Sequence, residues 1–413
     1  MKSHPSAQSI LHYDAPHQFE PLLPEAFRCG PLLEQAGDLI VAATQLAATP
    51  NAVALRELRR LLRSMNSYYT NRIEGEHTRP SEIDQALQQD FSAHAETARK
   101  QRLAVAHIRA EQACEQALRE QPAPAVAWLY EAAQLQRIHA TVFDGLPPED
   151  LRLSDGSLLQ PGALRERGVA VGRHEAPLAA SLPAFLARWQ QVYAGARRGE
   201  SALLAAAAAH HRLTWIHPFL DGNGRVARLH THLLFTALGL VNGLWSPLRG
   251  FARRQEQYKA LLQAADEHRR GDLDGRGNLS QAALVDWIRF VLETSLDQVR
   301  FMTEMLSLPR MRERMEAALA FEAGRNSGVR REALRPLHYL FATAEELPRA
   351  EFKAMTGLGE RVATGLVSAL LRAGYVAADS PYGALRFAVP SHALRFYFPA
   401  LWPEAEAEAL ARG

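Results

Sequence analysis

The sequence predicts an all-α protein. Residues 31–120 repeat leucine, alanine, glutamate and arginine at helical spacing, and further helical stretches follow at about 125–144, 181–195, 200–215 and 224–241. SALLAAAAAHH, residues 201–211, combines strong helix propensity with small side chains, which suits a buried helix against which others pack closely. Two regions depart from this pattern, at about 146–178 and after about 328.

Prolines and glycines set the expected breaks between helices. Thr49-Pro50-Asn51 and the segment from Gly75 to Pro80 interrupt the first helical region, and QPAP at 121–124 marks a joint. The region at 146–178 contains PGALRERGVAVGRH, residues 161–174, whose strand-length pieces around Gly168 predict a β-hairpin.

The carboxyl-terminal segment predicts a winged helix-turn-helix. Two helices are separated by the Gly357-Leu358-Gly359 turn, and an apolar strand pair joined at Asp379 to Gly383 follows. Residues 330–395 hold nine basic and six acidic residues, an excess too small to decide between DNA binding and protein docking. We divide the chain into a helical region (1–120), a core (121–298) and a carboxyl-terminal region (299–413).

Composition is that of an ordinary globular protein. The 413 residues are 47% hydrophobic and 22% charged, with a net charge of +2, so charge alone does not argue for a nucleic-acid partner. Two distant cysteines provide no zinc ligand set and no disulfide framework. We expect neither a cleaved signal nor a membrane span, and a cytoplasmic location.

One twelve-residue stretch concentrates the chemistry. HPFLDGNGRVAR, residues 217–228, lies between two predicted helices, so Asp221-Gly222-Asn223-Gly224 forms a turn that feeds a helix amino terminus. Glycines permit positive φ angles that point backbone N–H groups inward, and the helix dipole behind them favours anions. The stretch therefore predicts a site that handles phosphates.

Charged side chains complete this predicted site. Arg225 and Arg228 lie three residues apart and share one face of the first helical turn, where two guanidinium groups can grip separate phosphate oxygens. Asp221 is a candidate ligand for a divalent ion that bridges the phosphates, and His217 is a candidate general base. Each residue alone has an ordinary structural explanation, but together they predict transfer of a phosphate-containing group.

Two other patterns are rejected as metal sites. DLDGRGNLSQAA, residues 272–283, has Arg276 and Ala283 where a calcium loop needs ligands, so we expect a loop between core helices. The histidines His210, His211, His217, His230 and His232 have no carboxylate partner at ligand spacing in the sequence, and we expect His210 and His211 to pack or hydrogen-bond.

The twelve-residue stretch resembles the signature of the Fic family. That signature is histidine-proline-phenylalanine, any residue, aspartate or glutamate, glycine-asparagine-glycine-arginine, two residues and arginine, and every fixed position is matched. The resemblance extends through PGALRERGVAVG, similar to the family's flap, and through residues 258–293, similar to the helices that close the family's core. It covers roughly residues 125–295 and implies a Fic-type helical core with a β-hairpin flap. Family members mostly transfer AMP from ATP to a hydroxyl of a target protein and release pyrophosphate.

The resemblance also implies roles for individual residues. His217 is the general base, Asp221 holds Mg²⁺ or Mn²⁺, and Arg228 engages the γ-phosphate of ATP. The implied catalytic residues are His217, Asp221, Asn223, Arg225 and Arg228. The implied nucleotide-binding residues are Gly222, Asn223, Gly224, Arg225, Arg228 and Tyr258. The flap residues expected to dock the target on an exposed strand edge are Pro161, Gly162, Arg165, Val169 and Val171.

A second stretch resembles the family's inhibitory motif. Residues 70–75, TNRIEG, match serine or threonine, three residues, glutamate, then glycine or asparagine. Thr70 and Glu74 are one helical turn apart and project from the same face, at a helix end that Gly75 can cap. The resemblance implies that Glu74 pairs with Arg228, which places the protein among self-inhibited members with an amino-terminal inhibitory helix.

Three functions stay open at this point. The first is a self-inhibited adenylyltransferase that acts on a serine, threonine or tyrosine hydroxyl of a target protein. The second is another nucleotidyl or phosphoryl transfer, or removal of AMP with Glu74 orienting water. The third is a transcription regulator whose winged helix binds DNA while the Fic core senses nucleotide; the weakly basic wing argues against it. The expected partners are ATP and the target protein, with DNA weakly supported, a second copy of the chain left open, and no membrane.

Overall fold

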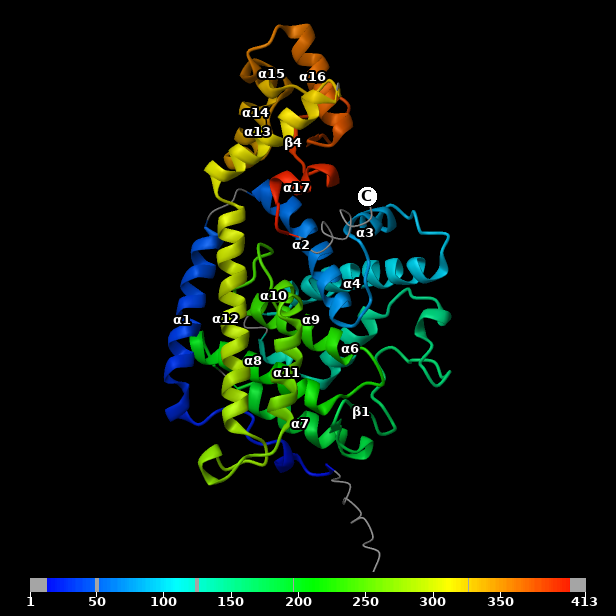
Figure 1. Ribbon diagram of the computed structural model, residues 1–413, viewed down its shortest axis with the longest axis vertical. Helices are drawn as coiled ribbons and strands as arrows, with labels where there is room; N and C mark the ends of the chain where they lie inside the picture. Colours follow the sequence, from blue (N-terminus) through cyan, green and yellow to red (C-terminus); the bar gives the residue numbers. More distant parts are fainter. Residues whose placement is uncertain (1–12, 49–51, 123–125, 196, 326, 402–413) are drawn as a thin grey trace, which may run out of the picture. The chain divides into compact units, whose positions relative to one another are not determined.

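The computed structural model describes residues 13–48, 52–122, 126–195, 197–325 and 327–401. This described part is predominantly helical and contains two antiparallel two-stranded sheets, which confirms the predicted all-α class (Figure 1). The chain divides into two compact units. The first comprises residues 1–37, 109–238 and 254–293, and the second comprises residues 38–108, 239–253 and 294–413.

Three helices each contribute residues to both units. They are α1 (Ala26–Ala47), α4 (Ala95–Arg119) and α12 (Gln281–Met305). Residue 298, the expected end of the core, lies inside α12, because helical sequence continues past it without a turn. The three-part division of the chain stays a prediction.

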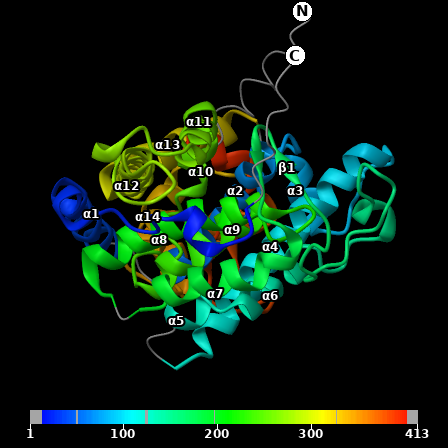
Figure 2. The same cartoon turned by 90° about the horizontal axis from the view of Figure 1, so that it is seen from below.

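The first unit is built around a pair of helices, α8 (Gly199–Ile216) and α9 (Asn223–Ala237), joined by a short loop. Helices α7 (Leu182–Tyr193) and α11 (Gln255–Asp266) pack on α8, whereas α5 (Val126–Leu129) and α6 (Ala132–Val142) pack on α9. Figure 2 shows α9 between α8 and α6. The loop between α8 and α9 is residues 217–222, so the packing of this pair fixes the position of the signature stretch.

The alanine run explains how α8 becomes the centre of this unit. Ala205 to Ala209 are each 2% exposed or less. The indole N–H of Trp189 donates to the carbonyl of Ala209 (3.2 Å), and that of Trp287 donates to the carbonyl of Ala207 (2.7 Å). Because buried indoles need a hydrogen-bond acceptor, small side chains that leave the helix backbone accessible suit these two rings. The predicted buried helix is confirmed.

The flap hairpin differs in position from the prediction. Its strands are β1 (Ala170–Val171) and β2 (His174–Glu175), with Val171 opposite His174, so the turn lies at Gly172 and not at Gly168. Gly172 has a φ of 62°, the left-handed conformation that tight hairpin turns require. The hairpin was expected around Gly168, and the pairing of Val171 with His174 moves its turn to Gly172.

The second unit contains the remaining elements. Arg249 of α10 (Leu248–Arg253) anchors part of it. Its guanidinium donates to Gln298 Oε1 (3.0 Å) and to the carbonyl of Ala400 (2.6 Å), and it lies 3.8 Å from the ring centroid of Phe301. The helices are α2 (Ala52–Ile73), α3 (Pro80–Leu87), α10 (Leu248–Arg253), α13 (Leu308–Gly324), α14 (Leu334–Ala342), α15 (Arg349–Thr356), α16 (Glu360–Ala373) and α17 (Leu394–Tyr397). Across both units, short 3-10 turns lie at Pro16–Phe19, Pro148–Leu151, Ala179–Ser181, Asp272–Asp274, Arg331–Ala333 and Ser391–Ala393.

The carboxyl-terminal part of this unit has the element order expected from its sequence. Helix α15 ends at Gly357, which has a φ of 70°, and α16 is followed by the antiparallel strands β3 (Val376–Ala377) and β4 (Arg386–Phe387). An isolated bridge between Leu347 and Leu385 extends this strand pairing. The winged-helix interpretation stays a prediction. In the described ranges, no helix combines the length with the apolar character that a bilayer span requires.

Candidate active site

The signature stretch begins with a reversal of the chain at His217. This residue follows the end of α8 with φ 49° and ψ 62°, a left-handed conformation that is uncommon for residues other than glycine. Its N–H donates to the carbonyl of Leu213 (3.1 Å), so His217 itself caps the helix. The cap turns the chain back toward α9 and leaves the imidazole at the head of the loop.

Asn223 closes the loop by bonding both main-chain groups of one residue, Phe219. Its Oδ1 accepts the N–H of Phe219 (2.9 Å), and its Nδ2 donates to the carbonyl of Phe219 (2.8 Å). Asn223 is 4% exposed, and both ends of its amide have partners in the loop. An aspartate could accept but not donate here, so an amide is the side chain that this geometry requires.

Gly222 is required by both conformation and space. Its φ is 78°, and a Cβ atom at this position would lie 2.6 Å from the ring of Phe143. Its N–H donates to Oδ1 of Asp221 (2.6 Å), and its carbonyl accepts the N–H of Val226 (2.9 Å), the first turn of α9. The turn thus delivers the chain into α9, whose first N–H groups have no intrahelical acceptor.

The two arginines of the signature are buried rather than solvated. Arg225 is 8% exposed, lies 4.6 Å from the ring centroid of Phe143 and has a guanidinium nitrogen 3.5 Å from Oδ2 of the exposed Asp221. Arg228 is 1% exposed, and after burial its charge is the next cause that lowers the pKa of His210. The amino terminus of α9 therefore combines helix N–H groups with two cations fixed by packing, as an anion site requires.

His217 is held as a neutral base. Its Nδ1 lies 3.3 Å from the carbonyl of Thr214, so the ring proton belongs on Nδ1 and the lone pair on Nε2. Burial lowers the pKa of His217 to about 4, and the nearby His174 and Arg165 act in the same direction. The imidazole is therefore deprotonated at neutral pH and can accept a proton.

Arg165 was expected to dock a target, and the structure corrects this role. Its side chain is 2% exposed and points inward, where Nε donates to the carbonyl of His217 (2.7 Å) and a terminal nitrogen donates to that of Ile216 (3.4 Å). It also donates to the carbonyls of Arg167 and Pro177. Burial lowers the pKa of Arg165 to about 10, which leaves it charged at neutral pH. A cation at the carboxyl end of α8 also complements the helix dipole.

Two further histidines hold the same loop. His174 of β2 lies with Nε2 2.7 Å from the carbonyl of Trp215, at the last turn of α8. His139 of α6 accepts the N–H of Gly162 at Nδ1 (2.7 Å), so its neutral ring carries the proton on Nε2 and donates to the carbonyl of Asp221 (3.1 Å). Burial lowers the pKa of His139 to about 4. His139 thereby ties the start of the flap to the signature loop.

Tyr258, expected among the nucleotide-binding residues, lies in the core. It is 2% exposed, and its hydroxyl lies 2.9 Å from Nε2 of His210, whose Nδ1 lies 2.7 Å from the hydroxyl oxygen of Thr231. The Thr231 hydroxyl donates to the carbonyl of Ala227, so His210 donates at Nδ1 and accepts from Tyr258 at Nε2. This network links α11 to α8 and α9 and confirms His210 as a hydrogen-bonding residue. His211 has the same role, with Nε2 3.0 Å from the carbonyl of Leu262.

The candidate inhibitory motif lies in the second unit. Thr70 is fully buried within α2, which ends at Ile73, and the exposed Glu74 belongs to the closing turn. Gly75 has a φ of 83°, and its N–H donates to the carbonyl of Arg72 (3.0 Å), which confirms its predicted capping role. The pairing of Glu74 with Arg228 stays a prediction.

Sequence reasoning missed His139, His174 and one side-chain cluster. The two histidines lie 78 and 43 residues before His217, and a single sequence gives no signal that they contact its loop. No carboxylate stands at ligand spacing from His232 in the sequence, but the fold brings Glu111 and Glu115 of α4 against it. Residues that are so far apart in the sequence form no spacing pattern from which their contact could be predicted.

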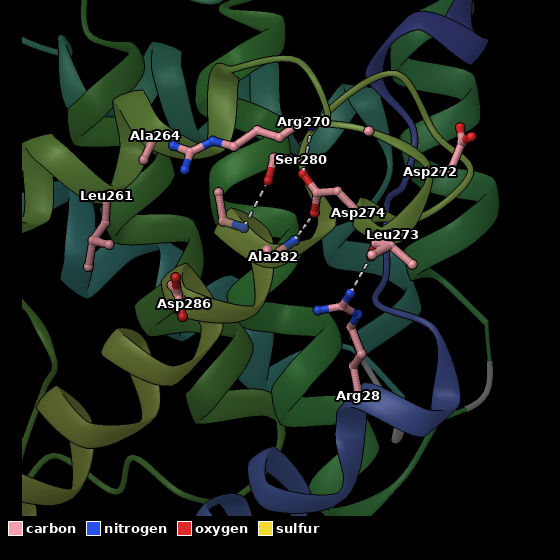
Figure 3. A pocket seen from close by; sticks show the side chains of 12 residues that line it. Arg28, Leu261, Ala264, Arg270, Asp272, Leu273, Asp274, Ser280, Ala282 and Asp286 are labelled. Carbon is pink, nitrogen blue, oxygen red and sulfur yellow. Dashed lines mark hydrogen bonds between the residues drawn. The ribbon is translucent and has the colours of Figure 1, made fainter.

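The rejected calcium loop lies between α11 and α12, as expected, and borders a cavity of about 490 Å³ (Figure 3). Asp274 is 8% exposed, and its carboxylate accepts the N–H groups of Ala282 (2.8 Å) and Arg270 (3.1 Å). This carboxylate braces the loop and the start of α12. The lining residues include Arg28, Leu273 and Asp286 and none from 217–228, so the cavity is separate from the signature loop.

The described fold is a Fic-type all-α core, and comparisons with known proteins agree. Residues 128–235 match the sequence profile of the Fic/DOC family. Proteins named "Protein adenylyltransferase Fic" from Drosophila mojavensis and Drosophila grimshawi are each 29% identical over 138 residues, which are 33% of this chain and 26% and 27% of theirs. The chain thus spans about a quarter of the length of the curated relatives that it matches.

A solved structure extends the likeness beyond the core. A Fic family protein from Desulfovibrio desulfuricans G20 matches 89% of this chain and 98% of its own, with a TM-score of 0.50 and 19% identity. At that identity the likeness concerns the fold. The profile match over residues 128–235 and the named relatives support a Fic family protein, and the structural likeness adds that the fold agrees.

The buried histidines predict a loss of stability in mild acid. Burial lowers the pKa of His139, His217 and His230 from 6.5 to about 4, so below pH 6.5 the unfolded chain binds protons that the folded chain does not. Each such group makes the free energy of unfolding fall by up to about 1.4 kcal/mol per pH unit between pH 6.5 and 4. Urea unfolding at pH 7, 6 and 5 measures this slope, and a pH-independent free energy over that range would contradict the burial of these rings.

The hydrogen bonds of Arg165 should stabilise the flap against local opening. In Arg165→Lys, one ammonium cannot reach the carbonyls that the guanidinium spans, and each lost charged hydrogen bond is worth about 1.5–3 kcal/mol. Amide hydrogen exchange in residues 162–178 should therefore be at least about tenfold faster. Arg173→Lys, at the exposed hairpin turn, is the matched control and should leave exchange unchanged. Equal exchange in the two variants would mean that Arg165 does not hold the flap.

Proposed function

We propose that this chain is a self-inhibited protein adenylyltransferase that transfers AMP from ATP to a hydroxyl side chain of a target protein. The observation that carries the proposal is the left-handed turn at His217, which leaves a neutral imidazole in the loop that leads into the arginine-bearing start of α9. The adenylyltransferase name of the curated relatives supports the same reaction.

The triphosphate of ATP would bind at the start of α9. The first N–H groups of the helix face this position, and Arg225 and Arg228 supply two positive charges that packing holds in place. Asn223 acts through the loop, because both ends of its amide bond Phe219. Arg228 would neutralise the γ-phosphate, which orients the α-phosphate toward His217.

A divalent ion fits the donor at the mouth of this cradle. Asp221 is the exposed carboxylate there, and Mg²⁺ commonly takes one carboxylate together with phosphate oxygens and water. When bound, Mg²⁺ or Mn²⁺ would neutralise charge on the phosphates. Oδ1 of Asp221 accepts the N–H of Gly222, and Oδ2 lies 3.5 Å from a guanidinium nitrogen of Arg225, so Oδ2 would exchange that contact for the ion.

The reaction needs one base and a leaving group. Nε2 of His217 takes the proton of the target hydroxyl as its oxygen bonds to the α-phosphorus. The bond from that phosphorus to the bridging oxygen breaks, and pyrophosphate leaves with the electron pair. The chain's part is to position the reactants and to neutralise the phosphates.

The target segment would add to the flap as an extra strand. Val171 is 48% exposed and Val169 is half-buried, next to the hairpin of β1 and β2. Main-chain pairing at such an edge tolerates varied target sequences. Pro161 is exposed and Gly162 is half-buried at the start of the flap, whereas the inward Arg165 takes no part in docking.

His217→Ala tests the base. Loss of general-base help typically costs about 10²–10⁴ in rate, and the phosphate cradle is built from other residues. Transfer of labelled AMP should fall by that factor while ATP binding, measured by calorimetry, stays within a few-fold of the parent. Parallel loss of binding and transfer would refute the role of His217.

Self-inhibition would come from Glu74 and its pairing with Arg228. Such a pair neutralises the cation that should hold the γ-phosphate, so ATP would bind with its α-phosphate misaligned. Thr70 and Gly75 would set the end of α2 from which Glu74 projects. A closed state favoured by a few kcal/mol keeps the competent population near one per cent, by the usual two-state arithmetic.

Glu74→Gly tests this pairing. The variant should modify itself with AMP roughly a hundredfold faster than the parent, because the competent state becomes dominant. Arg228→Ala should be slow, and adding Glu74→Gly to it should restore nothing. The rate of self-modification is measured with labelled ATP and Mg²⁺ for the parent, the two single variants and the double variant. A gain that survives the loss of Arg228 would show that Glu74 acts elsewhere.

A further inference from the structure

We propose that Glu111, Glu115 and His232 form a binding site for one transition-metal ion, of which Zn²⁺ is the expected occupant. The three side chains come from α4 and α9 within the first unit. This site is independent of the nucleotide cradle and of the transferase reaction.

The three side chains converge at distances that suit one ion. Nε2 of His232 lies 3.0 Å from Oε1 of Glu115 and 3.9 Å from Oε1 of Glu111, and the three ligand atoms all lie within 4.8 Å of one another. Ligand bonds of about 2.0–2.2 Å place neighbouring ligands on tetrahedral zinc roughly 3.4 Å apart. Rotamer adjustments of less than about 1 Å would therefore seat the ion among them.

The three side chains of the cluster are buried, and its two glutamates are close neighbours on one helix. Glu111, Glu115 and His232 are 1%, 8% and 2% exposed. The two glutamates are one turn apart on α4, where like charges repel, and a low dielectric strengthens the repulsion. A divalent cation between them turns this repulsion into attraction. Facing helices that supply glutamate and histidine are a recurrent way to build metal sites in helical bundles.

The donor set selects the kind of metal. Two carboxylate oxygens and one imidazole nitrogen suit zinc and its first-row neighbours, whereas Mg²⁺ and Ca²⁺ prefer oxygen ligands alone. The burial leaves little room for the several waters that Mg²⁺ retains. A solvent molecule as the fourth ligand would complete a tetrahedron. Oε2 of Glu115 lies 3.9 Å from Arg119, so a different oxygen of this carboxylate faces His232.

The bound ion would connect α4 to the helix that carries the signature. His232 follows Arg228 by one helical turn on α9, so the ion would restrain that helix close to its buried arginine. An ordinary hydrogen-bonded pair of His232 and Glu115 is the competing explanation. Metal uptake distinguishes the two, because the pair alone binds no ion.

The experiment uses untagged, nucleotide-free, full-length protein that has been treated with chelator and dialysed. Zn²⁺ is added with excess Mg²⁺, which occupies sites that have oxygen ligands, and bound zinc is measured by elemental analysis after gel filtration. The parent should retain about one Zn²⁺ per chain, and its melting temperature should rise. His232→Gln and Glu115→Gln should bind at least about tenfold more weakly, since even outer-shell changes cost 10–100-fold. Glu120→Gln, the exposed carboxylate just after α4, is the matched control and should bind as the parent does.

A second measurement on the parent alone tests the proposal even if a variant fails to fold. Circular dichroism checks each fold, and Co²⁺ titration of the parent alone should give the intense visible bands of a tetrahedral site with nitrogen and oxygen ligands. A parent that retains no Zn²⁺ and gives no such bands overturns the proposal. So does equal zinc retention by the parent and a folded His232→Gln.

Discussion

The carbonyl groups at the carboxyl end of α8 are the constraint on which the site depends. A helix that ends in a tight reversal leaves its last carbonyls without intrahelical donors, and here they lie inside the protein. Arg165 donates to those of Ile216 and His217, and His174 lies in hydrogen-bond range of that of Trp215. Because both side chains come from the flap, satisfying these carbonyls also fixes the flap beside the loop. The main chain of His217 is then held by the same contacts that hold the flap.

Burial acts on these groups in a consistent direction. It lowers the pKa of Arg165 to about 10, which still leaves a cation, and the pKa values of His139 and His217 to about 4, which leaves two neutral rings. One positive charge therefore faces the negative end of the α8 dipole, while the histidines act as directed donors and acceptors. The left-handed conformation of His217 has an energetic cost, and these surrounding contacts stabilise it.

The sequence predicted the helical class, the buried alanine-rich helix and the signature loop, because each follows from short-range patterns. Asp221 and Gly222 needed only neighbours in the chain to be placed in a turn. Contacts between distant segments were not predictable in this way. Arg165 was interpreted as an exposed flap residue, because the residues around it in the sequence do not indicate that it bonds the carbonyls of Ile216 and His217. Tyr258 is buried against His210, and Glu115 meets His232 across 117 residues, for the same reason. The hairpin turn lies at Gly172 and not around Gly168, because strand pairing, which local composition does not determine, sets the position of the turn.

We propose that the loop between α8 and α9 transfers a nucleotide group from ATP to a hydroxyl. Intact-mass spectrometry after incubating the protein with ATP, GTP, CTP or UTP and Mg²⁺ tests it most directly, because the added mass identifies the group without any assumption about the target. We predict the addition of AMP from ATP, found by fragmentation on a serine, threonine or tyrosine oxygen, and its loss in His217→Ala. Addition of phosphate alone, or no addition by Glu74→Gly with any of the four nucleotides, would contradict the account.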